Sequence, residues 1–417
     1  MHLLYTWFSM YGDDISTVLI VGAGFSHHAG LPLTSEFTDA VLAARDFRSG
    51  PSRIIVDFLT EFIYDAFAVP RRANAERWPD LEDIFTCVDL SANTGHHLGG
   101  SFAPADLRTV RRALLSRIIR MLNQKYEAAR KGKAPSWRAL DSFFSQLDLQ
   151  RTGFISMNWD TVIERKLALV SPLAVDYGCD AIAAGVPDVP DRESFRYKRD
   201  YDKALTQSQV INSSESKKER ETAGRRSTVV KIHGSANWLY CDNCRAVFWL
   251  HPDQWQKIAD QLIRADDLSR IEAFLRARGK LPADRIGGNH DRVQLNCRCC
   301  EGVALGTRIA TFSYRKALEF PMFQKSWAAA EALLHAAQKW VFIGYSLPAA
   351  DYEFKYLLKR VQLSRQGRPE ILVVSGGGKK QVRSTYENYR NFFGSNVRQR
   401  GFFSSGLTAE AVGTICR

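Results

Sequence analysis

The chain contains 417 residues, of which 45% are hydrophobic and 24% are charged. This composition is typical of a globular protein with two or three hydrophobic cores, and it excludes an intrinsically disordered chain. The sequence has no apolar run long enough to cross a bilayer, and its first residues lack the basic start and cleavage site of a signal peptide. We therefore expect a cytoplasmic protein with no membrane partner.

The net charge is strongly positive, with a formal value of +12 and an isoelectric point near 9.3. Such a charge favours polyanionic partners, which include nucleic acid, acidic proteins and phosphate-rich substrates. One predicted helix carries a cluster of basic residues, namely Arg108, Arg111, Arg112, Arg117, Arg120 and Lys125. A run of this kind is also typical of a solvated helix face, so the charge alone leaves both interpretations open.

A buried strand that turns through two glycines into a helix is the first ordered pattern in the chain. The strand, 18–21, is aliphatic and uncharged, as in strands buried on both faces. Gly22 and Gly24 lack the Cβ atoms that would keep backbone N–H groups from a phosphate, and a helix beginning near Phe25 would direct its positive end at the anion. A dinucleotide fingerprint needs a third glycine where His27 stands. The pattern therefore predicts a nucleotide loop of another kind, or a turn without a ligand.

Strands and helices alternate along the rest of the chain. Helices are predicted over 34–44, 53–67, 104–131 and 137–146, with another beginning near Trp78. These are more helices than one crossover connection needs, so we predict a helical insertion. Further strands are predicted over 152–156, 228–232, 340–343 and 371–374, with helices over 322–338 and from Asp351, and a loop-rich insertion over 170–226. The alternation predicts an α/β fold with a Rossmann-like parallel sheet.

Small or polar residues follow four of these strands. They are Gly22, Gly24 and Ser26, then Asn158 and Asp160, then His233 and Gly234, and finally Gly344 and Ser346. Because the carboxyl ends of parallel strands meet at one edge of a sheet, these residues should converge on one crevice. A lone histidine or an Asn-x-Asp pair is more often structural, and the convergence is what favours a ligand site. Ser375, which follows the strand predicted over 371–374, is assigned to cofactor binding with them.

Two cysteine pairs predict a metal site. Cys241 and Cys244, and then Cys297 and Cys300, have the spacing of a tetrahedral Zn²⁺ site, and a helix is predicted between the pairs over 255–277. Four thiolates leave no open coordination position, so the role would be structural. Cys299 competes with Cys300 as a ligand, and reduced thiols without metal remain an alternative.

The motifs, taken together and in order, resemble the sirtuin family. They are Gly22-Ala-Gly-Phe-Ser, Asn158-Trp-Asp, Lys231-Ile-His-Gly-Ser, the two cysteine pairs and Gly344-Tyr-Ser-Leu-Pro. The resemblance implies a sirtuin-type NAD-binding core, a helical insertion and a zinc-ribbon-like module. The corresponding bounds are 1–33, 149–240 and 301–417 for the core, 34–148 for the insertion and 241–300 for the module.

The resemblance also implies roles for individual residues. The NAD-binding glycine loop would comprise Gly22, Ala23, Gly24 and Ser26, with Gly344 and Ser346 near the adenosine half. Asn158 and Asp160 would hold the nicotinamide end and its ribose, and His233 would be the base that acts on the ribose hydroxyls.

The chain departs from the protein deacylases of the family. It has Leu33-Thr-Ser where they have Asp-Phe-Arg, and Met157-Asn-Trp-Asp where they have Gln-Asn-Ile-Asp. It more closely resembles the sirtuin-like effectors of bacterial anti-phage systems, which hydrolyse NAD to nicotinamide and ADP-ribose.

That resemblance implies an NAD hydrolase acting in abortive infection. It also implies a homo-oligomer with a partner, either an ATPase such as a HerA-type translocase or a nucleic-acid sensor. Two alternatives stay open at this point, an NAD-dependent protein deacylase and a nucleic-acid-binding or nuclease component that binds a nucleotide without turnover.

Overall fold

The computed structural model describes residues 15–43, 51–71, 78–170, 175–183, 227–281, 295–297, 299–300, 305–307, 309 and 321–417. Its centre is a seven-stranded sheet with the order β10-β9-β8-β1-β2-β5-β3, in which every neighbouring pair is parallel. The strands are β1 (Thr17–Val21), β2 (Thr152–Ser156), β3 (Val175–Asp176), β5 (Ser227–Lys231), β8 (Lys339–Ile343), β9 (Glu370–Val374) and β10 (Phe402–Phe403). The predicted parallel α/β fold class is confirmed.

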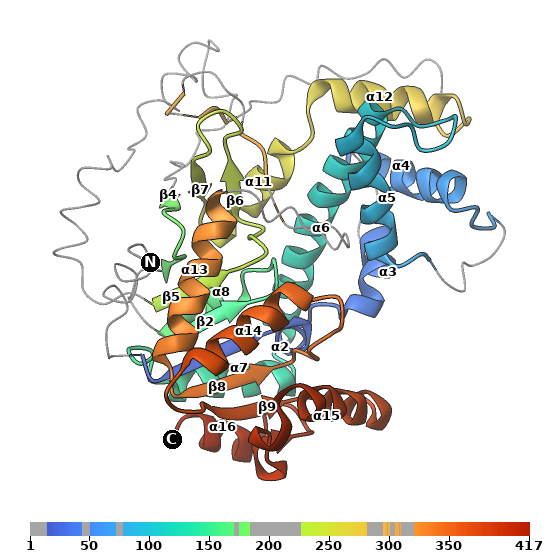
Figure 1. Cartoon of the computed structure of the whole chain (residues 1–417). Helices are drawn as coiled ribbons and strands as arrows, with labels where there is room; N and C mark the ends of the chain where they lie inside the picture. The colour runs from blue at the N-terminus through green and yellow to red at the C-terminus, as the bar shows by residue number, and fades with distance from the viewer. Residues whose placement is uncertain are drawn as a thin grey trace.

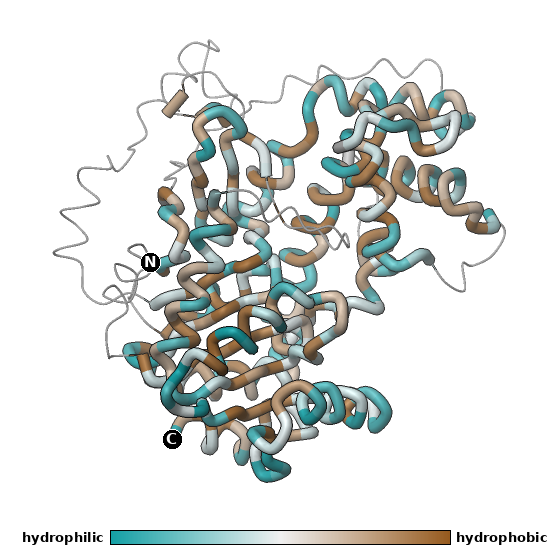
Figure 2. Tube along the Cα trace, in the orientation of Figure 1, coloured by the Kyte–Doolittle hydropathy of each residue, from teal (hydrophilic) through white to brown (hydrophobic). Residues whose placement is uncertain are grey.

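Helices cover both faces of this sheet, because successive residues of each strand point to opposite sides. Leu19 and Val21 face a core shared with α7 (Pro135–Gln146) and α16 (Ala409–Ile415). Val18 and Ile20 face a second core, which is closed by α13 (Pro321–Ala336), α14 (Tyr352–Ser364) and α15 (Lys379–Phe393). Figure 1 shows α13 and α14 crossing one face of the sheet. The strands are hydrophobic along their length, whereas α15 is largely hydrophilic (Figure 2).

A group of helices stands to one side of the sheet (Figure 1). It contains α3 (Phe37–Leu42), α4 (Pro51–Ala66), α5 (Leu81–Thr94) and the long α6 (Pro104–Gly132). The short α2 (Ala23–His27) and α8 (Val162–Val170) follow β1 and β2. The helices predicted over 53–67, 104–131 and 137–146 are thus confirmed, with ends that differ by up to two residues. The domain bounds given above stay a prediction.

The basic residues of α6 mostly face inward. Arg111 donates to Asp89 of α5 at 2.8 Å, and the Nε atom of Arg112 donates to Asp267 at 2.8 Å. Arg117 is buried and donates to the main-chain oxygen of Val41. Arg120 pairs with an aspartate carboxylate. The basic run is therefore neither a solvated face nor a free anion-binding surface over most of its length, because its guanidinium groups join α6 to its neighbours.

The single helix predicted over 255–277 is wrong. Two helices are present, α11 (Trp255–Gln261) and α12 (Ala265–Arg276), and the chain is extended at Arg264 between them. The Asp267 carboxylate accepts the Arg264 N–H at 3.0 Å while it also binds Arg112, so one acidic side chain both starts α12 and attaches it to α6. Figure 1 shows α12 lying against the helical group.

Two strands between β5 and α11 form a small second sheet with a strand that precedes β5. Its order is β4-β7-β6, with β4 (Ile182–Ala183), β6 (Trp238–Tyr240) and β7 (Val247–Trp249). The loop-rich interpretation of 170–226 misses β3 and β4, which are too short to produce a periodic pattern. Within this segment, 171–174 and 184–226 lie outside the described residues. No helix in the described ranges is long and apolar enough to cross a membrane.

Two loops at the carboxyl edge of the sheet touch through their backbones. They are the turn at Gly22 together with the first residues of α2 (22–26), called the glycine loop below, and the β8 loop (344–348). Gly24 N donates to Gly344 O at 2.9 Å. A Cβ added to Gly22 would lie 2.7 Å from Gly344 O, and one added to Gly344, whose φ is +61°, would lie 2.1 Å from Phe25 N. The missing Cβ atoms thus make room for the facing loop, which differs from the phosphate clearance expected from the sequence.

We predict that Gly344→Ala destabilises the protein by about 2–5 kcal/mol, from left-handed strain and from overpacking against the glycine loop. Gly413→Ala is the matched control, because no atom lies within 4 Å of the added Cβ in α16. There alanine should raise helix stability by up to about 1 kcal/mol. Thermal denaturation followed by circular dichroism measures both changes, and equal melting temperatures for the two variants would contradict the prediction.

Candidate functional site

A cavity of about 260 Å³ lies at the carboxyl edge of the sheet, where loops after β1, β2, β5 and β8 meet the helical group. This is the position at which chain order reverses, with β1 between β2 and β8, and open α/β sheets bind ligands at such a point. The predicted site residues that line it are Gly22, Ala23, Ser26, Asn158, Asp160, His233, Gly344 and Ser346. The expected convergence of distant segments is therefore present.

A hydrogen-bond chain connects the polar residues of the glycine loop and the β2 loop (157–161). Asn158 Nδ2 donates to Gly22 O and to Ser26 Oγ, both at 2.9 Å. Ser26 Oγ then donates to Asp160 Oδ2 at 2.6 Å, and Asp160 Oδ1 accepts the Val162 N–H at 3.0 Å. The carboxylate is thereby fixed in orientation. No described residue donates to Asn158 Oδ1, which remains available as an acceptor for a ligand.

The segment after β5 binds main-chain oxygens of the β2 loop. Ala236 N donates to Trp159 O at 2.7 Å. His233 is buried, and its Nδ1 lies 3.3 Å from Met157 O. Because a carbonyl oxygen only accepts, this contact requires Nδ1 to carry a proton. In the neutral form of the imidazole, Nε2 is then the nitrogen that accepts a proton.

A second acidic group, Asp351, lies after the β8 loop, directly before α14. Tyr345 Oη donates to Asp351 Oδ2 at 2.9 Å, and both residues line the cavity. Burial, and then the Asp351 charge, raise the pKa of Tyr345 well above 10, which keeps this hydroxyl a donor. Sequence reasoning missed Tyr345 as a lining residue, although it stands between two predicted positions.

Three carboxylate residues line the cavity, namely Glu82, Asp160 and Asp351, and no lysine or arginine does so among the described residues. Glu82 and Leu122 come from α5 and α6, so the helical group forms part of the wall. No sequence signal identifies Leu122, because its apolar position on α6 is indistinguishable from that of a core residue. Such a lining favours a cationic or hydroxyl-rich ligand over a bare phosphate.

Two predicted cofactor-binding residues do not line the cavity. Gly24 packs against Gly344. Ser375 is buried, and its main chain pairs with Phe403 O and with Gly406 N beside β10. Their assignment to cofactor binding stays a prediction.

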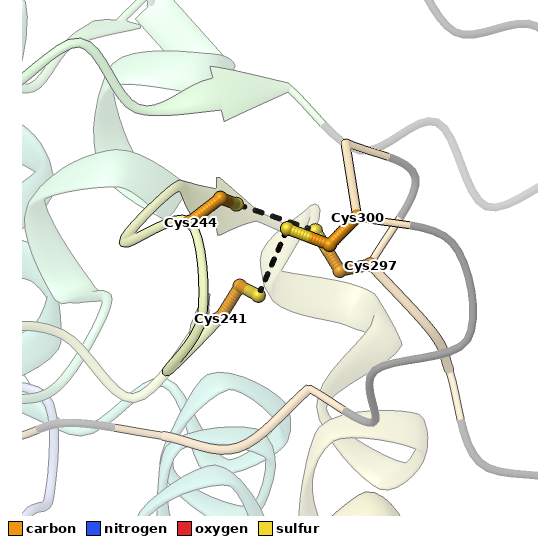
Figure 3. A group of neighbouring side chains, drawn as sticks. All are labelled: Cys241, Cys244, Cys297 and Cys300. Carbon is orange, nitrogen blue, oxygen red and sulfur yellow. Dashed lines mark hydrogen bonds between the residues drawn. The ribbon is translucent and has the colours of Figure 1, made fainter.

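Four cysteines form a second cluster, next to the small sheet. The Sγ atoms of Cys241, Cys244, Cys297 and Cys300 all lie within 4.8 Å of one another and point to a common centre (Figure 3). The Cys244–Cys297 and Cys241–Cys300 sulfur separations are 3.6 and 4.0 Å. Tetrahedral Zn–S bonds of about 2.3 Å require sulfurs about 3.8 Å apart. The donor set therefore fits zinc, and the cluster contains Cys300 instead of the exposed Cys299.

The pKa values of the cluster's thiols are shifted in opposite directions, because burial raises the pKa of Cys297 and a hydrogen bond with Cys244 raises the pKa of Cys300, whereas the pKa of Cys244 is lowered. Burial raises the pKa of Cys244, but the Ala246 N–H and the neighbouring thiols of Cys300 and Cys297 outweigh it and bring that pKa down to about 7. A thiol of this kind supplies a thiolate at neutral pH. Bound zinc would crosslink two segments that are distant in sequence, with no position left for a substrate.

Comparison with solved structures finds 16 similar chains. The chain is similar to a structure described as Sir2Tm bound to a propionylated peptide, with 12% sequence identity, a TM-score of 0.31, and coverage of 99% of this chain and 95% of that chain. Neither a protein-family model nor a curated protein sequence matches the chain.

We predict that the purified protein contains about one equivalent of zinc, as expected for a Cys₄ site. Cys300→Ser should lower the zinc content and the thermal stability, whereas Cys299→Ser should change neither. Elemental analysis by mass spectrometry after gel filtration measures the metal. Zinc loss from Cys299→Ser equal to that from Cys300→Ser would contradict the ligand assignment.

Proposed function

We propose that the protein is an NAD⁺ hydrolase that cleaves NAD⁺ to nicotinamide and ADP-ribose. The observation that carries the proposal is the meeting of Asn158, Asp160 and His233 with the glycine loop around one cavity. The order of the sequence motifs, which resembles sirtuin-like enzymes, supports the same chemistry.

The geometry suits cleavage of a glycosidic bond. Breaking the bond between nicotinamide and ribose leaves an oxocarbenium-like centre, and a fixed carboxylate offsets its positive charge. Asp160 is the carboxylate in this role, because Ser26 and the Val162 N–H hold both of its oxygens in place. Such a preformed arrangement costs no reorganisation at the moment of reaction.

The other two residues supply the polar chemistry. His233 Nε2 acts as the base toward a ribose hydroxyl or the attacking water. Asn158 Oδ1 accepts a hydrogen bond from the substrate, since both hydrogens of its amide are donated to the protein. This division makes the three residues non-interchangeable.

The cavity favours one half of the substrate. Its volume of about 260 Å³ is below the usual range of about 300–1,000 Å³ for pockets that enclose a whole small molecule. We therefore assign the nicotinamide-riboside half to it, which differs from the role near the adenosine half that the resemblance implies for Gly344 and Ser346. The pyridinium ring of NAD⁺ carries a positive charge, which suits a lining with three carboxylates and no basic side chain among the described residues.

The biological setting belongs to the same proposal. We propose that the enzyme is the effector of a bacterial anti-phage abortive-infection system, that it forms a homo-oligomer, and that a HerA-type ATPase or a nucleic-acid sensor controls it. Unregulated consumption of NAD⁺ would harm the host, and this toxicity is the reason to expect such control.

A nucleic-acid-binding or nuclease function is less well supported. Of the basic residues on α6, Arg111 and Arg112 already pair with Asp89 and Asp267. These arginines would have to give up buried partners in order to contact phosphates.

A protein deacylase differs from a hydrolase in that its reaction requires an acyl-lysine peptide.

We predict that the purified protein releases nicotinamide and ADP-ribose from NAD⁺, alone or after addition of lysate from phage-infected cells. Asn158→Ala and His233→Ala should each lower the rate by at least about 100-fold, as expected for loss of a general base or of a substrate-orienting group. His97→Ala is the matched control, because His97 is exposed and outside the cavity. Liquid chromatography measures the products, and circular dichroism checks that the variants are folded.

Full activity of a folded Asn158→Ala protein would contradict the assignment of the site. Nicotinamide release that depends on an acyl-lysine peptide, with an O-acyl-ADP-ribose product, would identify a deacylase instead.

A further inference from the structure

A buried lysine lies directly behind the β2 loop. Lys231 is the last residue of β5, and its side chain is 1% exposed. Its Nζ donates to the main-chain oxygen of Asp160 and lies 3.4 Å from Glu164 Oε1 on α8. One ammonium group thus connects a strand, the loop that carries the proposed catalytic residues, and the helix that follows this loop.

The partner carboxylate is buried as deeply as the lysine. Glu164 Oε1 lies 3.4 Å from Tyr177 Oη, which in turn accepts from Asn237 Nδ2 at 3.0 Å. Burial raises the pKa of Glu164, although the charge of Lys231 opposes that shift. The pair has no part in the cavity lining, and the second carboxylate oxygen of Glu164, Oε2, is buried without a hydrogen-bond partner among the described residues.

Fold stability alone does not explain a buried ion pair. Removing two charges from water is costly, and apolar residues of similar volume often serve a core equally well. A methionine at 231 would fill the space of the lysine, but it would leave Asp160 O without its donor. The feature that an apolar pair cannot replace is therefore the contact with the loop.

The contact between Lys231 and Asp160 O is one of three that hold main-chain oxygens of the β2 loop. The main-chain oxygens of Met157, Trp159 and Asp160 are held by the segment 231–236, through His233, Ala236 and Lys231. Asp160, the last of these residues, also carries the carboxylate that Ser26 orients. A small rotation of the Asp160 peptide would move that carboxylate relative to the cavity.

We propose that Lys231 is a positioning residue for the NAD⁺-cleaving site, and that Glu164 balances its buried charge. Lys231 fixes the peptide of Asp160, so that the carboxylate faces the ribose carbon at which positive charge develops. This inference rests on the proposed function, because its main readout is the cleavage of NAD⁺.

The first test is Lys231→Met. We expect kcat to fall about 10- to 100-fold, the range that displacement of a reacting group by a fraction of an ångström to one ångström produces. KM should change by less than about threefold, because Lys231 does not touch the substrate. Hydrogen exchange followed by mass spectrometry should be faster in peptides that cover 157–161.

Lys166→Met is the matched control. Lys166 is also a buried lysine, but it pairs with Asp141 and stacks on Trp137, away from the β2 loop. This variant should lower the melting temperature while kcat stays within about threefold of the wild type. A loss of kcat equal to that of Lys231→Met would reduce the role of Lys231 to general stability and overturn the proposal.

Two more variants separate charge from position. Glu164→Gln keeps an acceptor for Lys231 and should retain kcat within about threefold. The double variant Lys231→Met with Glu164→Gln removes the unpaired buried carboxylate, so its melting temperature should exceed that of Lys231→Met. Its kcat should nevertheless stay low, and recovery of kcat in the double variant would overturn the proposal.

Failure of the proposed function has a different signature. If the wild type consumes no NAD⁺ under any condition, the hydrolase assignment fails. Hydrogen exchange still tests the contact between Lys231 and the Asp160 peptide, because it needs no turnover. Unchanged exchange over 157–161 in Lys231→Met would overturn the positioning role, whatever the enzyme acts on.

Discussion

The site depends on the direct backbone contact between the glycine loop and the β8 loop. Gly22 and Gly344 approach so closely that neither position has room for a Cβ atom, and Gly344 also has a left-handed conformation. The contact joins the ends of two neighbouring parallel strands at the point where strand order reverses. This contact fixes the glycine loop, so Ser26 lies within hydrogen-bond distance of both Asn158 and Asp160. One hydrogen-bond chain therefore connects the three side chains. The polar geometry of the cavity therefore follows from a steric constraint on glycines.

Much of this arrangement was predictable, because it follows from local patterns and from one topological rule. Uninterrupted aliphatic runs identified strands buried on both faces, and parallel pairing then required their ends to converge, which brings Asn158 and His233 to the same cavity. The spacing of the cysteine pairs identified the cluster in the same way. The role of the glycines was harder to predict, since a missing Cβ serves a phosphate and a neighbouring backbone equally well.

What the sequence could not reveal depends on contacts between distant segments. The inward orientation of Arg112 requires Asp267, which is far along the chain, and the break before α12 has the same cause. A periodicity argument treats the two helices as one because the apolar spacing continues through the break. Cys299 and Cys300 are adjacent and chemically identical, so only the folded chain distinguishes the member of the cluster. In the sequence, Lys231 is indistinguishable from an ordinary charged residue at the end of a strand, because its partners Asp160 O and Glu164 are brought to it only by the fold.

The strand order also has a consequence for synthesis on the ribosome. The first strand, β1, pairs with β8 in a register that places Thr17 beside Lys339. One of the first segments to be synthesised therefore pairs with one of the last. Until that partner has left the ribosome, the glycine loop has no facing loop and the cavity lacks one wall. Contacts of such long sequence separation form late because loop closure must precede them. A nascent chain therefore lacks the complete cavity until β8 and the loop after it have been synthesised.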